Sequence, residues 1–169
     1  MRTIISIVCL TAVLLLGCRL ASPSVASTPL SFYVVSEEKV EGGRFIDTPD
    51  FPKLGYIAAA PDLVIARLEA VAPDVSRRQD VMVDKDGKET VMPLQTKPAL
   101  TIRMHADDAK KFTTLTEQAV GKRVLIMLGE TPLIAPMVQS PIPTQSLILT
   151  LGDKTDNKKI EDELKRLVR

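Results

Sequence analysis

An uncharged, mainly apolar run near the N-terminus limits how this 169-residue chain can fold. The run extends from Thr3 to Leu16, follows the positive charge of Arg2 and closes on Gly17-Cys18. Its length of about 14 residues is too short to cross a hydrocarbon core, which takes about 20 residues. It suits the central region of an export signal instead. We therefore expect residues 1–17 to be a cleaved signal peptide and the folded domain to lie after them.

The four residues at the end of this run, Leu15-Leu16-Gly17-Cys18, resemble the bacterial lipobox. In that motif the cysteine is acylated and the signal is removed just before it. The resemblance implies a lipoprotein with a palmitate-type acyl anchor on Cys18, held on a membrane of the bacterial cell envelope and facing the periplasm. Residues 18–30 are predicted to form the lipidated cysteine and a flexible tether, because they are small, polar and interrupted by proline. Residues 31–169 are predicted to form a single domain.

Cysteine usage restricts the chemistry of the mature chain. Cys9 lies inside the apolar run and would leave with the signal, and the sulfur of Cys18 would be tied up as a thioether to lipid. No cysteine would then remain for a disulfide, a thiolate nucleophile or a metal site. We expect no cofactor and no bound metal.

The charge balance argues against nucleic acid as a partner. The chain has 22 basic and 21 acidic residues, and removal of Arg2 with the signal leaves 21 of each. A neutral domain lacks the positive charge that dominates affinity for phosphates. Aromatic residues make up only 4% of the chain and tryptophan is absent, so platforms for stacking bases are not expected either.

Apolar periodicity predicts more strands than helices. The two helices are expected at 107–120, with acids in the first turn and Gly121 after its end, and at 160–168, with Glu161–Lys165 and Asp162–Arg166 pairs. A turn is expected at Gly42-Gly43, and irregular structure at 47–61, where prolines are frequent. Strands are expected at 31–35, 63–71, 100–104, 123–128, 133–138 and 147–151, and a hairpin at 80–92. This order predicts an α+β fold, with a mixed or antiparallel sheet packed by two main helices.

Three polar motifs are candidates for chemistry, and each has a simpler interpretation. His105, the only histidine, is expected at a strand–helix junction, where it is a partly exposed residue rather than a base or ligand. Asp84-x-Asp86-Gly87 begins like a calcium loop, but Gln95 occupies the twelfth position, where a bidentate glutamate is needed. Asp107 and Asp108 are adjacent, so they do not face each other and are expected to stabilise a helix start. We expect no catalytic residue among them.

The C-terminal half of the chain resembles the head subdomain of the first periplasmic domain of SecD, a component of the protein-export machinery. The resemblance rests on residues 106–112, on Val120-Gly121-Lys122-Arg123-Val124, on Ala135-Pro136 and on a closing helix at 160–168. It covers roughly 70 residues, and its motifs are structural rather than catalytic. It implies a head-like α+β fold and a surface that contacts polypeptides.

The first functional hypothesis is therefore a non-catalytic, lipid-anchored envelope protein that binds a protein or peptide. Domains rich in strands can capture extended peptides by pairing at a sheet edge. One alternative is an enzyme whose site is dispersed over His105 and the loop at 47–61. A second alternative is a structural envelope spacer without a saturable ligand.

Overall fold

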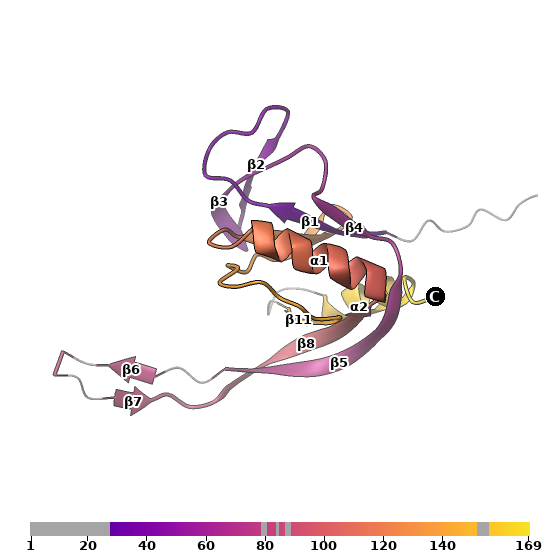
Figure 1. Cartoon of the computed structure of the whole chain (residues 1–169). Coiled ribbons are helices and arrows are strands. Elements are labelled where there is room, and N and C mark those ends of the chain that lie inside the picture. Colours follow the sequence, from indigo (N-terminus) through magenta and orange to yellow (C-terminus); the bar gives the residue numbers. More distant parts are fainter. Residues whose placement is uncertain (1–27, 79–80, 84, 87–88, 152–155) are drawn as a thin grey trace, which may run out of the picture.

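The structure, a computed structural model, describes residues 28–169 except 79–80, 84, 87–88 and 152–155. The predicted signal, Cys18 and most of the predicted tether therefore lie outside the described residues. The described part folds into mostly antiparallel sheets and two helices, as expected for an α+β protein (Figure 1). In chain order its elements are β1 (Leu30–Val34), β2 (Arg44–Thr48), β3 (Phe51–Ile57), β4 (Leu63–Ile65), β5 (Leu68–Arg78), β6 (Val81–Val83), β7 (Glu89–Val91), β8 (Gln95–Met104), α1 (Ala106–Gln118), β9 (Val124–Leu128), β10 (Thr131–Ile134), β11 (Ser146–Thr150) and α2 (Asn157–Lys165).

Two sheets carry the body of the domain. The larger one has the strand order β10-β9-β1-β4 and the smaller one the order β11-β8-β5, and all pairs within them are antiparallel. Two further hairpins, β2-β3 and β6-β7, stand beside them. The strands predicted at 31–35, 100–104, 123–128 and 147–151 and the hairpin at 80–92 are thus confirmed.

Strand β9 lies between two hydrophobic cores, which explains why all five of its residues are buried. Side chains at Val124, Ile126 and Leu128 enter the main core, while Leu125 and Met127 enter a second core on the opposite face. A strand buried on both faces is a continuous apolar run rather than an alternating one. The VLIML sequence of β9 has that pattern.

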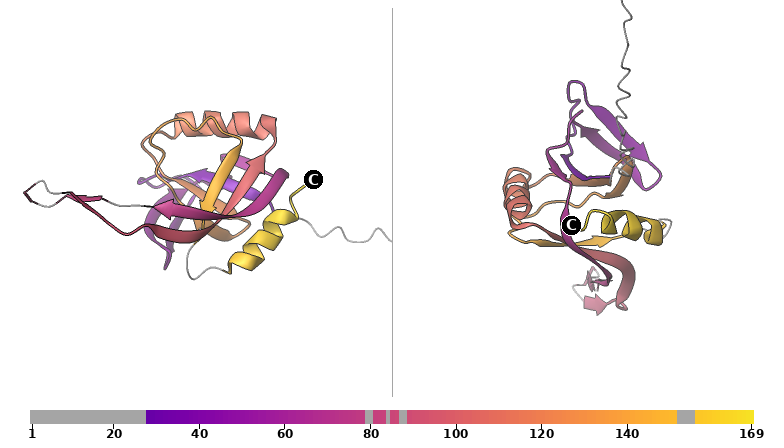
Figure 2. Two further views of the ribbon diagram at one scale, coloured as in Figure 1. Left: turned by 90° about the horizontal axis from the view of Figure 1, so that it is seen from below. Right: turned by 90° about the vertical axis from the view of Figure 1, so that its right-hand side faces the viewer.

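Helix α1 covers the main core on one side. Its buried residues are Ala109, Phe112, Leu115 and Thr116, and the ring of Phe112 lies 5.5 Å from the ring of Phe32 on β1. Asp107 and Asp108 occupy the first turn, and Gly121 follows the helix with a φ of 80°, as the sequence predicted. Helix α2 lies on the opposite side of the body from α1 (Figure 2).

Strands β5 and β8 form a long arm. They pair from Leu68 to Arg78, whereas β11 covers only the part of β8 from Ala99 to Arg103. Beyond that point the two strands run on together toward the β6-β7 hairpin, which projects from the body (Figure 1). Neither helix in the described part of the chain is long and apolar enough to cross a membrane.

The prediction of irregular structure at 47–61 was wrong. This region contains most of the β2-β3 hairpin, whose buried residues Ile46 and Ile57 close the second core. The prolines do not prevent pairing, because Pro49 lies in the turn and Pro52 lies where the register shifts between Ile46 and Thr48. Irregular pairing of this kind is where a strand tolerates proline.

Two predicted elements have other bounds than expected. The strand predicted at 133–138 ends at Ile134, since a bulge and Pro136 interrupt it, and only a bridge from Arg123 to Met137 continues the pairing. The helix predicted at 160–168 begins at Asn157 and ends at Lys165. After that end, the carbonyl of Leu167 accepts the N–H of Leu68 at 2.8 Å, so the C-terminal residues pair with the start of β5.

The two ion pairs predicted on the last helix fare differently. Lys165 Nζ lies 2.5 Å from Glu161 Oε1, as predicted. Asp162 instead pairs with Lys158 at 2.6 Å, one turn before it rather than one turn after it. Because the helix ends at Lys165, the expected partner Arg166 is already the C-cap residue.

Candidate functional site

The structure does not bring the polar sequence candidates into one site. His105 is the N-cap residue of α1, and its Nδ1 lies 3.7 Å from Glu69 Oε1, which belongs to a half-exposed ion pair with Arg103. In the loop at 47–61, Asp47 Oδ1 accepts the backbone N–H of Lys53 at 3.0 Å. These side-chain contacts are thus local to each of the two regions.

The remaining candidates also have local partners. Asp107 and Asp108 each lie within 4 Å of a lysine three residues later, at 3.5 Å from Lys110 and 3.0 Å from Lys111, as expected for acids at a helix start. Asp84 and Gly87 of the calcium-like motif lie outside the described residues. Within the described ranges, no cluster of three or more histidine, cysteine or carboxylate side chains is arranged to hold a metal.

The feature that stands out instead is a groove along β10 and β11. This cavity has a volume of about 530 Å³. It lies between Leu133–Pro136 and the edge of β11 at Ile148 and Thr150. Phe51, the first residue of β3, also lines it. We call this cavity the edge groove. Most of the residues that line it are apolar, and Asp50, Lys97 and Thr150 line it as well. Ile148 leaves 57% of its surface exposed.

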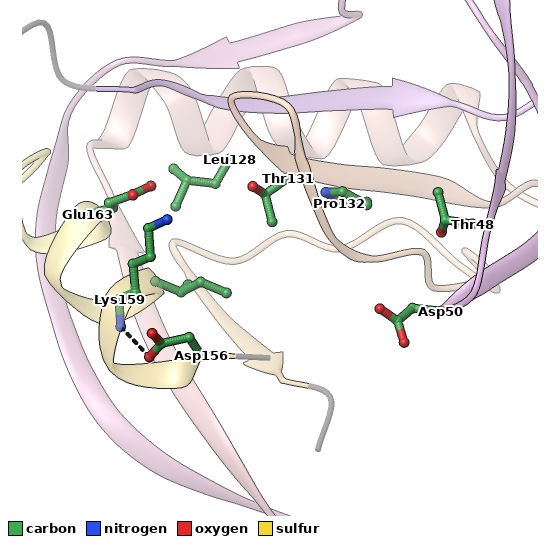
Figure 3. A pocket seen from close by; sticks show the side chains of 9 residues that line it. Thr48, Asp50, Leu128, Thr131, Pro132, Asp156, Lys159 and Glu163 are labelled. Atoms are coloured by element: carbon green, nitrogen blue, oxygen red, sulfur yellow. Dashed lines mark hydrogen bonds between the residues drawn. The ribbon is translucent and has the colours of Figure 1, made fainter. Parts of the chain in front are cut away.

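A second cavity of about 410 Å³ continues the edge groove toward α2, and the two share Asp50 and Pro132. Figure 3 shows Lys159 and Glu163 of α2 and the N-cap residue Asp156 on one side of this cavity, with Thr131 and Pro132 across from them. Asp156 caps α2 by accepting the N–H of Lys159 at 3.1 Å. More charged side chains therefore line the continuation than line the edge groove.

Along β11, the register with β8 determines which N–H and C=O groups face β8 and which face away from it. The N–H of Met104 donates to the carbonyl of Gln145 at 2.8 Å, and the N–H of Leu151 donates to the carbonyl of Pro98 at 3.2 Å. In an antiparallel ladder, the residues that bond to the partner alternate with residues whose N–H and C=O face away. Residues 145, 147, 149 and 151 therefore face β8, and the backbones of Ser146, Ile148 and Thr150 face away from it.

Sequence reasoning predicted the strand but missed this edge. The apolar run at 147–151 is visible in the sequence, but which neighbour it pairs with is a long-range property. The sequence does offer one signal for the start of the strand. Thr144 lies two residues before Ser146, and a threonine at that spacing can hydrogen-bond the backbone locally. Its hydroxyl both accepts the N–H of Ser146 and donates to the carbonyl of Ser146, each at 3.1 Å.

Comparison with known proteins identifies the fold. No protein-family model matches the chain, and no curated protein matches it. A solved structure of SecDF, described as a membrane component that enhances protein export, matches with a TM-score of 0.50 and 17% identity over 85% of this chain. SecDF in its super-membrane-facing form matches with a TM-score of 0.51 and 18% identity over the same share.

The fold is thus similar to part of SecDF, as the SecD resemblance predicted. The chain spans 63% of the first of these SecDF chains and 19% of the second, so it corresponds to a portion of each. At such identities the likeness concerns the fold.

Proposed function

We propose that this chain is a non-catalytic, lipid-anchored protein of the bacterial cell envelope whose SecD head-like domain binds polypeptides. The observation that carries the proposal is the edge groove, an apolar cavity bounded by a strand whose outer backbone groups face away from its sheet. The likeness to a protein that enhances protein export supports a polypeptide as the ligand.

The lack of catalysis is part of the same proposal. Asp107 and Asp108 pair with neighbouring lysines. His105 lies at the start of α1 near Glu69, and among the described residues its Nε2 is buried without a hydrogen-bond partner. We further propose that α1 and α2 pack the sheets as in a SecD head. That packing is supported by Phe112 and Leu164, which are buried in the main core from the two helices.

Polypeptide binding is tested with the full chain and a permanently unfolded model polypeptide, reduced and carboxymethylated. We expect saturable binding in fluorescence anisotropy, and we expect a photo-crosslinker placed at Asp50, an exposed residue that lines the edge groove, to attach to the same polypeptide. Absence of saturable binding would contradict the proposal and favour a spacer.

The anchor is a separate part of the proposal and rests on the sequence around Cys18. Metabolic labelling of cells with a radioactive fatty acid should mark the chain, and Cys18→Ser should abolish the label and release the protein from membranes. Cys9→Ser is the matched control, because Cys9 would leave with the signal. An unlabelled wild-type chain would contradict lipidation without touching the binding proposal.

A further inference from the structure

The two walls of the edge groove differ in what their backbones offer. On the β10 wall, Pro132 and Pro136 have no N–H, and the strand is interrupted by a bulge between Pro132 and Ile134. The carbonyl of Ala135 accepts a bond from Arg123 Nη1 at 3.1 Å. Prolines, bulges and short length are the devices by which proteins blunt a sheet edge. This wall can add little to a strand ladder.

The β11 wall is different, because two of its three outward-facing residues keep both backbone groups open. Ser146 is the exception, since the Thr144 hydroxyl bonds its N–H and its carbonyl. No side-chain hydrogen bond between described residues reaches the N–H or C=O of Ile148 or Thr150, and both residues line the edge groove. Four backbone groups therefore face away from β8, at two residues that line the edge groove, without a ladder partner among the described residues.

This combination specifies the chemistry of a ligand. Alternating donors and acceptors along a strand are matched by another extended backbone, which is the basis of strand addition. The walls formed by Leu133, Ile134 and Phe51 would contact the side chains of that backbone and favour apolar ones. A segment of about five residues spans the open edge at roughly 3.4 Å per residue.

We propose that an extended, apolar segment of another polypeptide binds by adding a strand to β11, with its backbone paired to Ile148 and Thr150. This inference rests on the proposed polypeptide-binding function and specifies its mode. The segment is recognised by its backbone and its alternating apolar side chains rather than by an individual sequence.

The test uses the full chain and a nine-residue probe, acetyl-Lys-Thr-Val-Thr-Val-Thr-Val-Thr-Lys-amide. In one derivative the three valines are N-methylated, and in the other the three threonines that directly precede a valine are N-methylated. Both derivatives keep the charge and composition of the side chains. Because alternate N–H groups of a strand face opposite sides, strand addition to one edge requires that only one derivative loses affinity. We expect a loss of roughly tenfold or more for that derivative and a change of less than about threefold for the other.

Two variants of the chain repeat the test from the protein side. Ile148→Pro removes an outward N–H without touching the ladder to β8, and we expect it to weaken binding by roughly tenfold. Ile148→Ala keeps the N–H and removes only side-chain contacts, so we expect a loss of about threefold. Should Ile148→Pro fail to fold, the methylated probes still decide the matter with the wild-type chain.

The outcomes separate the two proposals. If the unmethylated probe and the unfolded polypeptide both fail to bind, the proposed function is wrong and the inference falls with it. Another outcome is that they bind and that the two methylated probes behave alike, with both or neither losing affinity. Polypeptide binding then stands, and strand addition to one edge is overturned. A dimer of the chain that Ile148→Pro dissociates would show that a second copy occupies the edge, which also overturns the proposal.

Discussion

The two edges of the small sheet, β5 and β11, are treated in opposite ways. Along β5, the residues that face away from β8 include Pro73, which has no N–H, and Val75, whose N–H donates to Asp74 Oδ1 at 2.7 Å. Along β11, Ile148 and Thr150 face away from β8 with no such guard. One sheet therefore has an edge that is guarded at Pro73 and Val75 and an edge that is open at Ile148 and Thr150.

The two edge strands also differ in their length and in what surrounds them. Strand β5 has 11 residues and continues into the projecting arm, so an open edge there would be a long template for aggregation. Strand β11 has five residues and opens into the edge groove between other elements. A short edge inside a groove limits which partners can reach it, and this suggests that the openness of β11 is functional.

The largest expected effect separates the two faces of the β11 backbone. Leu149 is fully buried and its N–H faces β8, so Leu149→Pro should remove a ladder bond and lower the free energy of unfolding by about 3 kcal/mol or more. Ile148→Pro should cost only about 1 kcal/mol, because its N–H faces outward. Urea unfolding followed by circular dichroism measures both. Equal losses would contradict the assignment of the Leu149 N–H to the β8 side and of the Ile148 N–H to the outer side.

The second prediction converts the guarded edge into an open one. The double change Pro73→Val and Asp74→Ala supplies an N–H at position 73 and frees the N–H of Val75, so we expect self-association that grows with concentration. Each new backbone bond should contribute about 1 kcal/mol, and sedimentation velocity would show the oligomers. Pro141→Val is the matched control, because it makes the same change in an exposed loop outside the strands. A monomeric double variant would argue that something else guards β5.

The third prediction extends the open edge by one residue. Thr144→Val removes the hydroxyl that bonds Ser146, so a bound strand gains access to one more N–H and C=O. We expect the affinity for the nine-residue probe to rise roughly threefold to tenfold. Thr114→Val, which removes an exposed hydroxyl bonded to the helix carbonyl of Lys110, should leave the affinity unchanged. If Thr144→Val leaves the affinity unchanged, the bound strand does not pair with the backbone of Ser146.

The smallest expected effect concerns pH at the guarded edge. The hydrogen bond from the Thr101 hydroxyl, followed by that from the Val75 N–H, holds the pKa of Asp74 below its usual 3.8. Because the folded pKa is depressed, the guard is fully present above pH 3.8 and is lost as the pH falls through the folded pKa. Exchange of the Val75 amide, measured by NMR and corrected for its intrinsic pH dependence, should lose protection only in that acidic window. Asp74→Asn should show no such step.

Much of the sheet was predictable, but the difference between its edges was not. The strand at 147–151 and the hairpin at 80–92 follow from local runs of branched apolar residues. Whether Ile148 or Leu149 faces the neighbouring strand depends on the register with β8, which is set some 45 residues earlier in the chain. Pro73 and Asp74 are visible in the sequence, yet they act as guards only once that register is fixed. In the region at 47–61, the prolines predict irregular structure, but in the fold a turn accommodates Pro49 and a bulge accommodates Pro52.

The most direct test of the open edge is amide hydrogen exchange along β11, measured by NMR with and without the nine-residue probe. In the free chain, the amides of Leu147 and Leu149 should be protected and those of Ile148 and Thr150 should exchange at least tenfold faster, because only the first pair faces β8. Saturation with the probe should slow Ile148 and Thr150 and leave Leu147 and Leu149 little changed. Protection of all four amides in the free chain, or no change at Ile148 and Thr150 when the probe is bound, would contradict strand addition at β11.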